Sequence, residues 1–420
     1  MKTRHIAHIT VEADTPLKVG SNASDFIQDS PIQRDFNGLP MILGTSIAGV
    51  LRKDFDKEKV ADIFGEKNGS KVIFSNALLC INAKNEVCEE LLPEKTPFLQ
   101  FFDTLPIREH TAITEKGVAK EHAKFDEEIL YKGSRFKFSI EVLEDEESFL
   151  EILALLSSAS FRLGGGSTKG FGKLKILEIQ KDSFEIDTYE NYSSSLNYKL
   201  KEPYEIKKSI SKTHIEYTLK ITPEDFFIFG SGFGDKDADA TPTYEYIIDY
   251  TQENLGKKQI LIPASSIKGA LSHRTTFHYN SLVGNSIEAE NGLRSLEAIF
   301  GSAKDSEDKT KKGSKGKLIL SDCFQDNKEK TKTFDHVSID RFTGGAIDGA
   351  LFQEKTIAQK DMWEIEILLD TSVQEKELEA FEKALKDITT GMLSLGGMTT
   401  KGHGVFVGKV FRNGEELQRD

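Results

Sequence analysis

The sequence has few cysteines and no long apolar segment. Only Cys80, Cys88 and Cys323 occur among 420 residues, too few for a disulfide framework or a four-cysteine zinc site. No apolar run reaches the roughly 18 residues that a membrane-spanning helix needs. The first residues, MKTRHIAHITVEADT, lack the apolar core of a signal peptide and alternate as a strand does. We therefore expect a cytoplasmic protein with no contact to a membrane.

Positive charge is also in short supply. The chain has 55 Lys and Arg against 68 Asp and Glu, which gives a net charge of −13. Free-standing nucleic-acid binders usually carry net positive charge, so a binder of this composition needs its basic residues gathered locally. The length corresponds to about two domains at about 100–200 residues each.

A glycine-rich string occurs twice. Residues 161–176 are FRLGGGSTKGFGKLKI, and residues 393–407 are LSLGGMTTKGHGVFV. The matched positions are Gly164, Gly165, Lys169, Gly170 and Gly172 in the first copy and Gly396, Gly397, Lys401, Gly402 and Gly404 in the second. The repeat indicates a duplicated structural unit.

Other segments recur in the same order. MILGTSIAGVLRKDF (residues 41–55) matches LIPASSIKGALSHRTTF (residues 261–277), an Ile-Phe-Gly follows each, and His110 and His336 then take equivalent places. We interpret this order as a tandem duplication. It predicts a first domain over residues 1–180, a linker over 181–212 and a second domain over 213–420.

The pattern within each half predicts an α+β fold. Residues 5–13 and 214–222 alternate as half-buried strands, and Ser46 is a suitable N-cap for a helix that follows. Two amphipathic helices run directly into the glycine-rich loops, and a strand follows each loop. The order strand, helix, strands, helix, glycine loop, strand is typical of a split βαβ unit, which is RRM-like or ferredoxin-like.

The glycine loops do not fit the common nucleotide-binding motifs. Gly165 and Gly170 have the spacing of a P-loop, but Phe171 stands where that motif needs lysine, and the helix precedes the loop instead of following it. Two interpretations stay open. Each loop is either a plain turn that needs positive φ, or a backbone surface whose N–H groups approach phosphate, helped by Lys169 and Lys173.

The stretch HVSIDRFTGGAIDGALF (residues 336–352), together with the paired loops, resembles the RAMP superfamily. More narrowly, it resembles the repeated backbone subunits of type III CRISPR effector complexes. That resemblance implies two tandem RAMP domains, each with a thumb-like hairpin insertion, over residues 104–125 and 334–352. Phe342 and Ile347 are candidate wedges between RNA bases. The first half departs from the pattern, since Thr-Gly-Gly-Ala is absent near His110.

The resemblance also implies functions for particular residues. It predicts a subunit that binds guide RNA (crRNA), meets other effector subunits, and cleaves the paired target RNA with Mg²⁺ or another divalent metal. Asp29 and Asp239 are the predicted catalytic and metal-binding carboxylates, and Asp35, Asp235 and Asp237 are the alternatives. The predicted RNA-binding residues are Ser46, Arg52, Lys169, Lys173, Ser266, Lys268, His273, Arg274, Arg341 and Lys401.

Two other functions stay open at this stage. The chain could be a structural RNA-binding subunit without catalysis. It could also be a guide-processing endoribonuclease of the same superfamily, which would use a histidine-centred acid–base site and for which His110 and His336 are the candidates.

Overall fold

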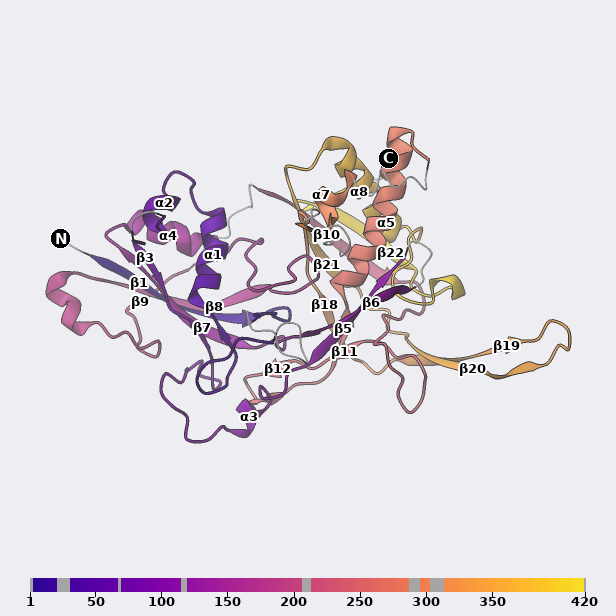
Figure 1. The fold of residues 1–420 in the computed structure, drawn as a ribbon, viewed down its shortest axis with the longest axis horizontal. Coiled ribbons are helices and arrows are strands. Elements are labelled where there is room, and N and C mark those ends of the chain that lie inside the picture. Colours follow the sequence, from indigo (N-terminus) through magenta and orange to yellow (C-terminus); the bar gives the residue numbers. More distant parts are fainter. Residues whose placement is uncertain are drawn as a thin grey trace.

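The computed structural model describes residues 3–20, 31–66, 69–114, 119–205, 213–286, 295–302 and 313–418. The chain forms two α+β halves that lie side by side, with the first half in indigo and magenta and the second in orange and yellow (Figure 1). Each half has an antiparallel sheet and its own helices, as predicted for ferredoxin-like domains. No helix in the described part of the chain is both long and apolar enough to cross a bilayer.

The first half is built around β1 (Arg4–Ala13), which pairs antiparallel with β7 (Arg135–Leu143) and β8 (Leu174–Phe184). β4 (Ala77–Leu79) and β3 (Val72–Phe74) pair with β7, β2 (Met41–Ile42) pairs with β4, and β9 (Glu202–Pro203) pairs with β8. Helices α1 (Gly44–Asp54) and α4 (Glu146–Leu155) pack against each other and the sheet. The smaller elements are α2 (Val60–Ile63), α3 (Pro97–Gln100) and η1 (Ile186–Asn191).

The second half repeats this order. β10 (His214–Pro223) lies between β21 (Trp363–Asp370) and β22 (Phe406–Arg412), and β17 (Leu318–Leu320) pairs with β21. Helices α5 (Ala264–Val283) and α8 (Glu375–Thr389) take the places of α1 and α4. The other elements are β11 (Tyr244–Glu245), β12 (Ile248–Asp249), β13 (Asn254–Leu255), β14 (Gln259–Ile262), α7 (Glu297–Phe300), β15 (Gly301–Ser302), β16 (Ser314–Lys315), β18 (Cys323–Asp326), η2 (Thr399–Lys401) and β23 (Glu415–Glu416).

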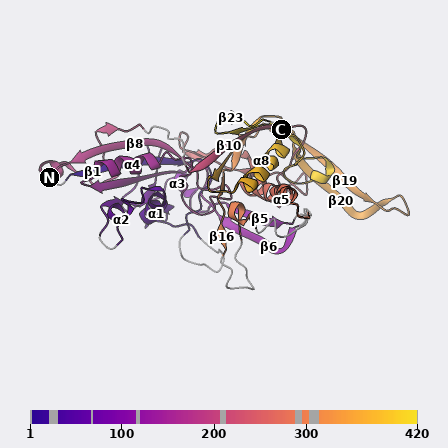
Figure 2. The ribbon, with the colours of Figure 1, turned by 90° about the horizontal axis from the view of Figure 1, so that it is seen from above.

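Both halves carry a hairpin, which lies between β4 and β7 in the first half and between β18 and β21 in the second. The first is β5 (Ile107–Ile113) with β6 (Ala119–Glu128), and the second is β19 (Thr331–Ile339) with β20 (Ala346–Ile357). Their registers match, because His110 faces Phe125 and His336 faces Phe352. The first hairpin reaches the second half, whereas the second projects away from the body (Figures 1 and 2). The predicted thumb-like insertions are thus confirmed.

The hydrophobic cores are separate except at one place. Most core residues of the first half come from its own sheet and helices, but Ile248 and Tyr250 of the second half join them. Tyr250 is buried, its hydroxyl donates to the carbonyl of Cys80 at 2.9 Å, and its ring packs on Phe98. The segment around β12 therefore fastens the second half to the first.

The helix starts differ from the prediction that Ser46 caps its helix. Helix α1 begins at Gly44, so Ser46 lies inside its first turn, exposed, and no side chain of the N-cap residue accepts a hydrogen bond. A remote side chain does so instead: Gly44 N–H donates to Asn76 Oδ1 at 2.9 Å. In the second half Ala264 N–H donates to Asp322 Oδ1 at 2.8 Å. The Ser46 cap is therefore wrong, because a neighbouring strand end supplies the acceptor.

The segment predicted as a linker is partly packed. Leu196 and Leu200 are buried against the first half, and β9 extends its sheet. Residues 206–212 of this segment lie outside the described part of the chain. The domain boundaries themselves stay a prediction.

Candidate nucleic-acid interface

The glycine loops are tight turns whose backbone lies directly against another backbone segment of the same half. Gly164 has φ +84°, and a Cβ there would overlap the carbonyl of Lys18, to which Gly165 N–H donates at 2.7 Å. In the second half Gly396 has φ +92°, and a Cβ there would overlap the carbonyl of Ile228. Side chains are excluded at both places because the backbones approach so closely and φ is positive. The geometry of both loops therefore agrees with turns that need positive φ. Whether the loops also bind phosphate depends on their lysines.

In the first half, Lys169 of the loop lies near a buried glutamate of the hairpin. Lys18 Nζ lies 2.8 Å and Lys169 Nζ 3.4 Å from Glu127 Oε1. His110 Nε2 lies 3.1 Å from Oε2 of the same carboxylate. Lys169 also lies 4.5 Å from the ring centroid of Phe125. Burial disfavours the ionised form of Glu127, but bonds from His110 and Lys18 outweigh it and hold its pKa well below the usual range.

The second half builds the same cluster from partly different residues. Glu354 is fully buried, and His403 Nε2 lies 2.7 Å from its Oε1. His336 Nε2 lies 3.2 Å from the same oxygen, and Lys401 Nζ lies 3.7 Å from Oε2. Lys401 is 5.3 Å from the ring centroid of Phe352. Glu354 Oε2 makes no hydrogen bond with any described residue.

The first glycine loop also meets the second half. Asp322 N–H donates to the carbonyl of Gly170 at 3.3 Å, and a Cβ on Gly170 would overlap the Asp322 carboxylate and touch Ala264. Lys268, on the first turns of α5, lies near enough to Lys169 that burial and this second ammonium lower its pKa. The loop of Lys169 and the helix of Lys268, from different halves, are thus neighbours where Gly170 touches Asp322 and Ala264, a contact region that we call the joint.

An arginine of the first hairpin locks this joint. The Arg108 guanidinium is buried and pairs with Asp322 and with Glu245. Burial disfavours its charge, but the two carboxylates outweigh that effect and raise its pKa. The side chain of Asp322 is fully buried and that of Glu245 mostly buried, and Arg108 is a cation that these two carboxylates share.

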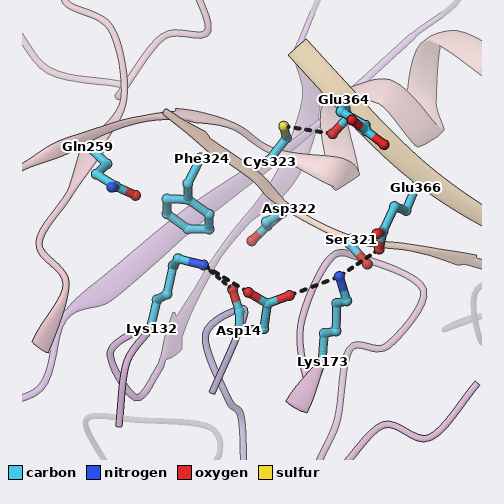
Figure 3. A pocket seen from close by; sticks show the side chains of 10 residues that line it. All are labelled: Asp14, Lys132, Lys173, Gln259, Ser321, Asp322, Cys323, Phe324, Glu364 and Glu366. Carbon is cyan, nitrogen blue, oxygen red and sulfur yellow. Dashed lines mark hydrogen bonds and ion pairs between the residues drawn. The ribbon is translucent and has the colours of Figure 1, made fainter. Parts of the chain in front are cut away.

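A polar cavity of about 380 Å³ lies between the halves (Figure 3). Lys173, a predicted RNA contact, points into it and bonds Asp14 at 2.8 Å and Glu366 at 2.6 Å. Lys132 also bonds Asp14, at 3.1 Å. Lys173 therefore links the two halves through Glu366, whereas the pair of Lys132 and Asp14 lies within the first half.

The other predicted RNA-binding residues are scattered. Ser46, Arg52, Ser266 and Arg341 are exposed, and His273 is half-buried on α5. Arg274 pairs with Asp387, which also lies 2.7 Å from His278 Nε2. The candidate wedge Phe342 is fully exposed at the tip of the second hairpin, and Ile347 is exposed beside it. The RNA-binding and wedge functions of these residues therefore stay predictions.

The structure describes one of the two predicted catalytic carboxylates, Asp239. Asp29 lies outside the described residues. Asp239 lies along β20, where its Oδ2 accepts from the N–H of Gln353 at 2.8 Å. Asp235 and Asp237 both pair with Lys355, at 2.8 Å and 3.2 Å.

Asp35, the remaining alternative, accepts two backbone N–H bonds in its own turn, from Asn37 at 2.8 Å and Leu39 at 2.9 Å. Among the described residues no three carboxylate, histidine or cysteine side chains form a metal-binding group. Asp239 therefore fits a divalent metal only as a single ligand, with water and RNA phosphate oxygens as the others.

The sequence pattern missed four side chains that organise these sites: Arg108, Glu127, Asp322 and Glu354. A signal for the glutamates was present, since Glu127 and Glu354 each follow the hairpin phenylalanine by two residues. No such signal marks Arg108, whose partner lies 214 positions away.

Comparison with known families is decisive at this point. A family model described as RAMPs, the RAMP superfamily, matches residues 10–175 and 244–407. The chain belongs to the RAMP superfamily. No curated protein matches it. The two matched stretches agree with a tandem RAMP backbone protein, and RAMP membership supports a CRISPR-associated RNA-binding subunit. RAMP proteins typically bind RNA and act in multisubunit CRISPR complexes.

Proposed function

We propose that this chain is a cytoplasmic backbone subunit of a type III CRISPR effector complex, and that its two RAMP halves bind guide RNA. The observation that carries the proposal is the meeting of the first glycine loop with helix α5, where Gly170 lies against Ala264, so that the loop of Lys169 and the helix of Lys268 are neighbours. Lysine side chains supply the sequence-independent attraction that a guide of variable sequence requires. The second loop presents Lys401 in an equivalent place for a further stretch of RNA.

Purification from the native host tests this proposal. Small RNA of uniform length and other effector subunits should accompany the chain, and Lys169→Ala with Lys401→Ala should reduce the RNA recovered. A chain that purifies alone and does not retain single-stranded RNA at low salt would exclude the proposal.

The second part of the proposal is cleavage of target RNA paired with the guide. Asp239 supports it, because it bonds Gln353, the neighbour of Glu354, and so lies beside the cluster that holds Lys401. A bound Mg²⁺ would polarise the scissile phosphodiester. The residues of this chain would hold the phosphate, orient it and contribute one carboxylate ligand.

Target RNA in the assembled complex, with and without Mg²⁺, tests cleavage. Fixed cuts that need the metal favour this activity. Binding without cuts would favour the structural subunit. Cuts in precursor RNA by the isolated chain without metal would favour the histidine-centred alternative at His110 and His336.

A further inference from the structure

Lys169 and Lys401, the lysines of the two glycine loops, share a feature that RNA binding alone does not require. Each is paired with a buried carboxylate of the adjacent hairpin, Glu127 or Glu354. The pairing recurs although the closest partner of the carboxylate differs: Lys18 at 2.8 Å in the first half, and His403 at 2.7 Å in the second. The loop lysine is the most distant of the three basic side chains around each carboxylate, at 3.4 Å in the first half and 3.7 Å in the second.

These distances define the state of each loop lysine. An N⁺–H···O⁻ hydrogen bond is ordinarily about 2.7–2.9 Å long, so both lysines are attracted by the carboxylate without being held closely by it. The side chains of Lys169 and Lys401 are 36% and 37% exposed, whereas Glu127 and Glu354 are 8% and 0% exposed. Each lysine side chain is therefore partly open to an approaching phosphate, whereas the carboxylate beside it is buried.

We propose that Glu127 and Glu354 are built-in counter-charges that compete with RNA phosphate for Lys169 and Lys401 and thereby limit the grip of each loop on RNA. The proposal rests on the RNA-binding function proposed above and concerns its regulation. A phosphate that approaches either loop meets an ammonium whose charge is already partly neutralised. Single contacts stay weak, and stable binding requires a strand that engages both loops.

The chain offers an isosteric test. Glu127→Gln and Glu354→Gln keep the shape and one acceptor oxygen but remove the charge. The probe is a fluorescently labelled single-stranded oligouridylate, and the measurement is its dissociation constant for the full chain at about 0.15 M salt, where the Debye length is about 8 Å. Each substitution should tighten binding about threefold to tenfold, the size expected for removing one charge several ångströms from a phosphate at an effective dielectric constant near 20 with salt screening.

The effect must pass through the lysine. In a Lys169→Ala background Glu127→Gln should change the dissociation constant by less than about twofold, and likewise for Glu354→Gln in a Lys401→Ala background. Glu379→Gln is the matched control, since it removes an equal charge from an exposed pair with Lys383 on α8. It should leave the dissociation constant nearly unchanged.

The outcomes separate the two proposals. Wild-type protein that does not bind the oligonucleotide would overturn the RNA-binding function. Wild-type protein that binds, with folded glutamine variants that bind equally or more weakly, would overturn only the counter-charge. Should Glu354→Gln fail to fold, the Glu127→Gln cycle decides, because the closest partner of Glu127 is the partly exposed Lys18, whereas that of Glu354 is the buried His403.

Discussion

Gly170 and Asp322 are in direct contact across the joint of the two halves. The N–H of Asp322 donates to the carbonyl of Gly170 at 3.3 Å, and the Asp322 carboxylate occupies the place that a side chain on residue 170 would need. The first glycine loop is thus shaped by the second half as well as by its own turn. The matching glycine of the second loop, Gly402, has nothing within 4 Å of its Cβ position.

This difference makes a matched pair of substitutions. Gly170→Ala adds a steric overlap to a backbone at φ +115°, and we expect it to destabilise the protein by clearly more than Gly402→Ala at φ +89°. The backbone effect alone is worth about 1–3 kcal/mol at either position. Urea denaturation measures both. Equal losses would show that the contact with Asp322 contributes nothing.

Removal of Arg108 should be more damaging than any surface change. Arg108→Met leaves the buried Asp322 without its ion-pair partner, and breaking a buried pair costs about 3–5 kcal/mol. Asp322→Asn in the same chain should recover much of this loss, because Asn76 already caps α1 in the first half without a charge. Denaturant unfolding of the single and double variants checks this, and a double variant no more stable than Arg108→Met would contradict it.

The loop lysines should appear in the salt dependence of RNA binding. Lys169→Ala and Lys401→Ala should each reduce the slope of log affinity against log salt by up to about 0.7, the value for one lost phosphate contact on a single strand. Titrations at several salt concentrations give the slope. If the double variant keeps the wild-type slope, neither lysine contacts phosphate and the loops are turns only.

The predicted carboxylates should affect cleavage and leave target binding intact. Asp29→Ala should remove one cut in the assembled complex. Asp239→Asn should remove another while it keeps an acceptor for the N–H of Gln353. The products are compared on a sequencing gel beside a target-binding assay. Loss of binding together with cleavage would assign these residues a structural function.

Acid should destabilise the fold of the first half through Asp14, which pairs with two lysines of the same half. Burial disfavours its charge, but Lys132 and Lys173 outweigh that effect and lower its pKa from 3.8 to about 2. A lowered pKa stabilises the fold above pH 3.8, and this contribution disappears as the pH falls to about 2. The difference in unfolding free energy between wild type and Asp14→Asn should therefore be constant near neutrality and shrink between pH 4 and pH 2. A difference that does not change with pH would exclude the ionic contribution.

The repeat and the periodic strands predicted the α+β fold, because both are local features of sequence, and the resemblance to the RAMP superfamily predicted both hairpins. The duplicated loop also singled out Lys169 and Lys401, whose contact with RNA stays a prediction. The cap of α1 was assigned wrongly to Ser46, since the true acceptor, Asn76, lies 32 positions away on another element. Arg108 and Asp322 could not be paired from sequence either, because nothing local distinguishes a charge that is buried by a second domain from one that is solvated.

The ion pair between Arg108 and Asp322 makes the contact between the two repeated halves asymmetric. At the positions that match them in the repeat, the second hairpin has Phe334 and the first half has Asn76. If the second hairpin met the first half in the way that the first hairpin meets the second, Phe334 would face Asn76 and no ion pair would form. The two copies are therefore no longer interchangeable at this contact.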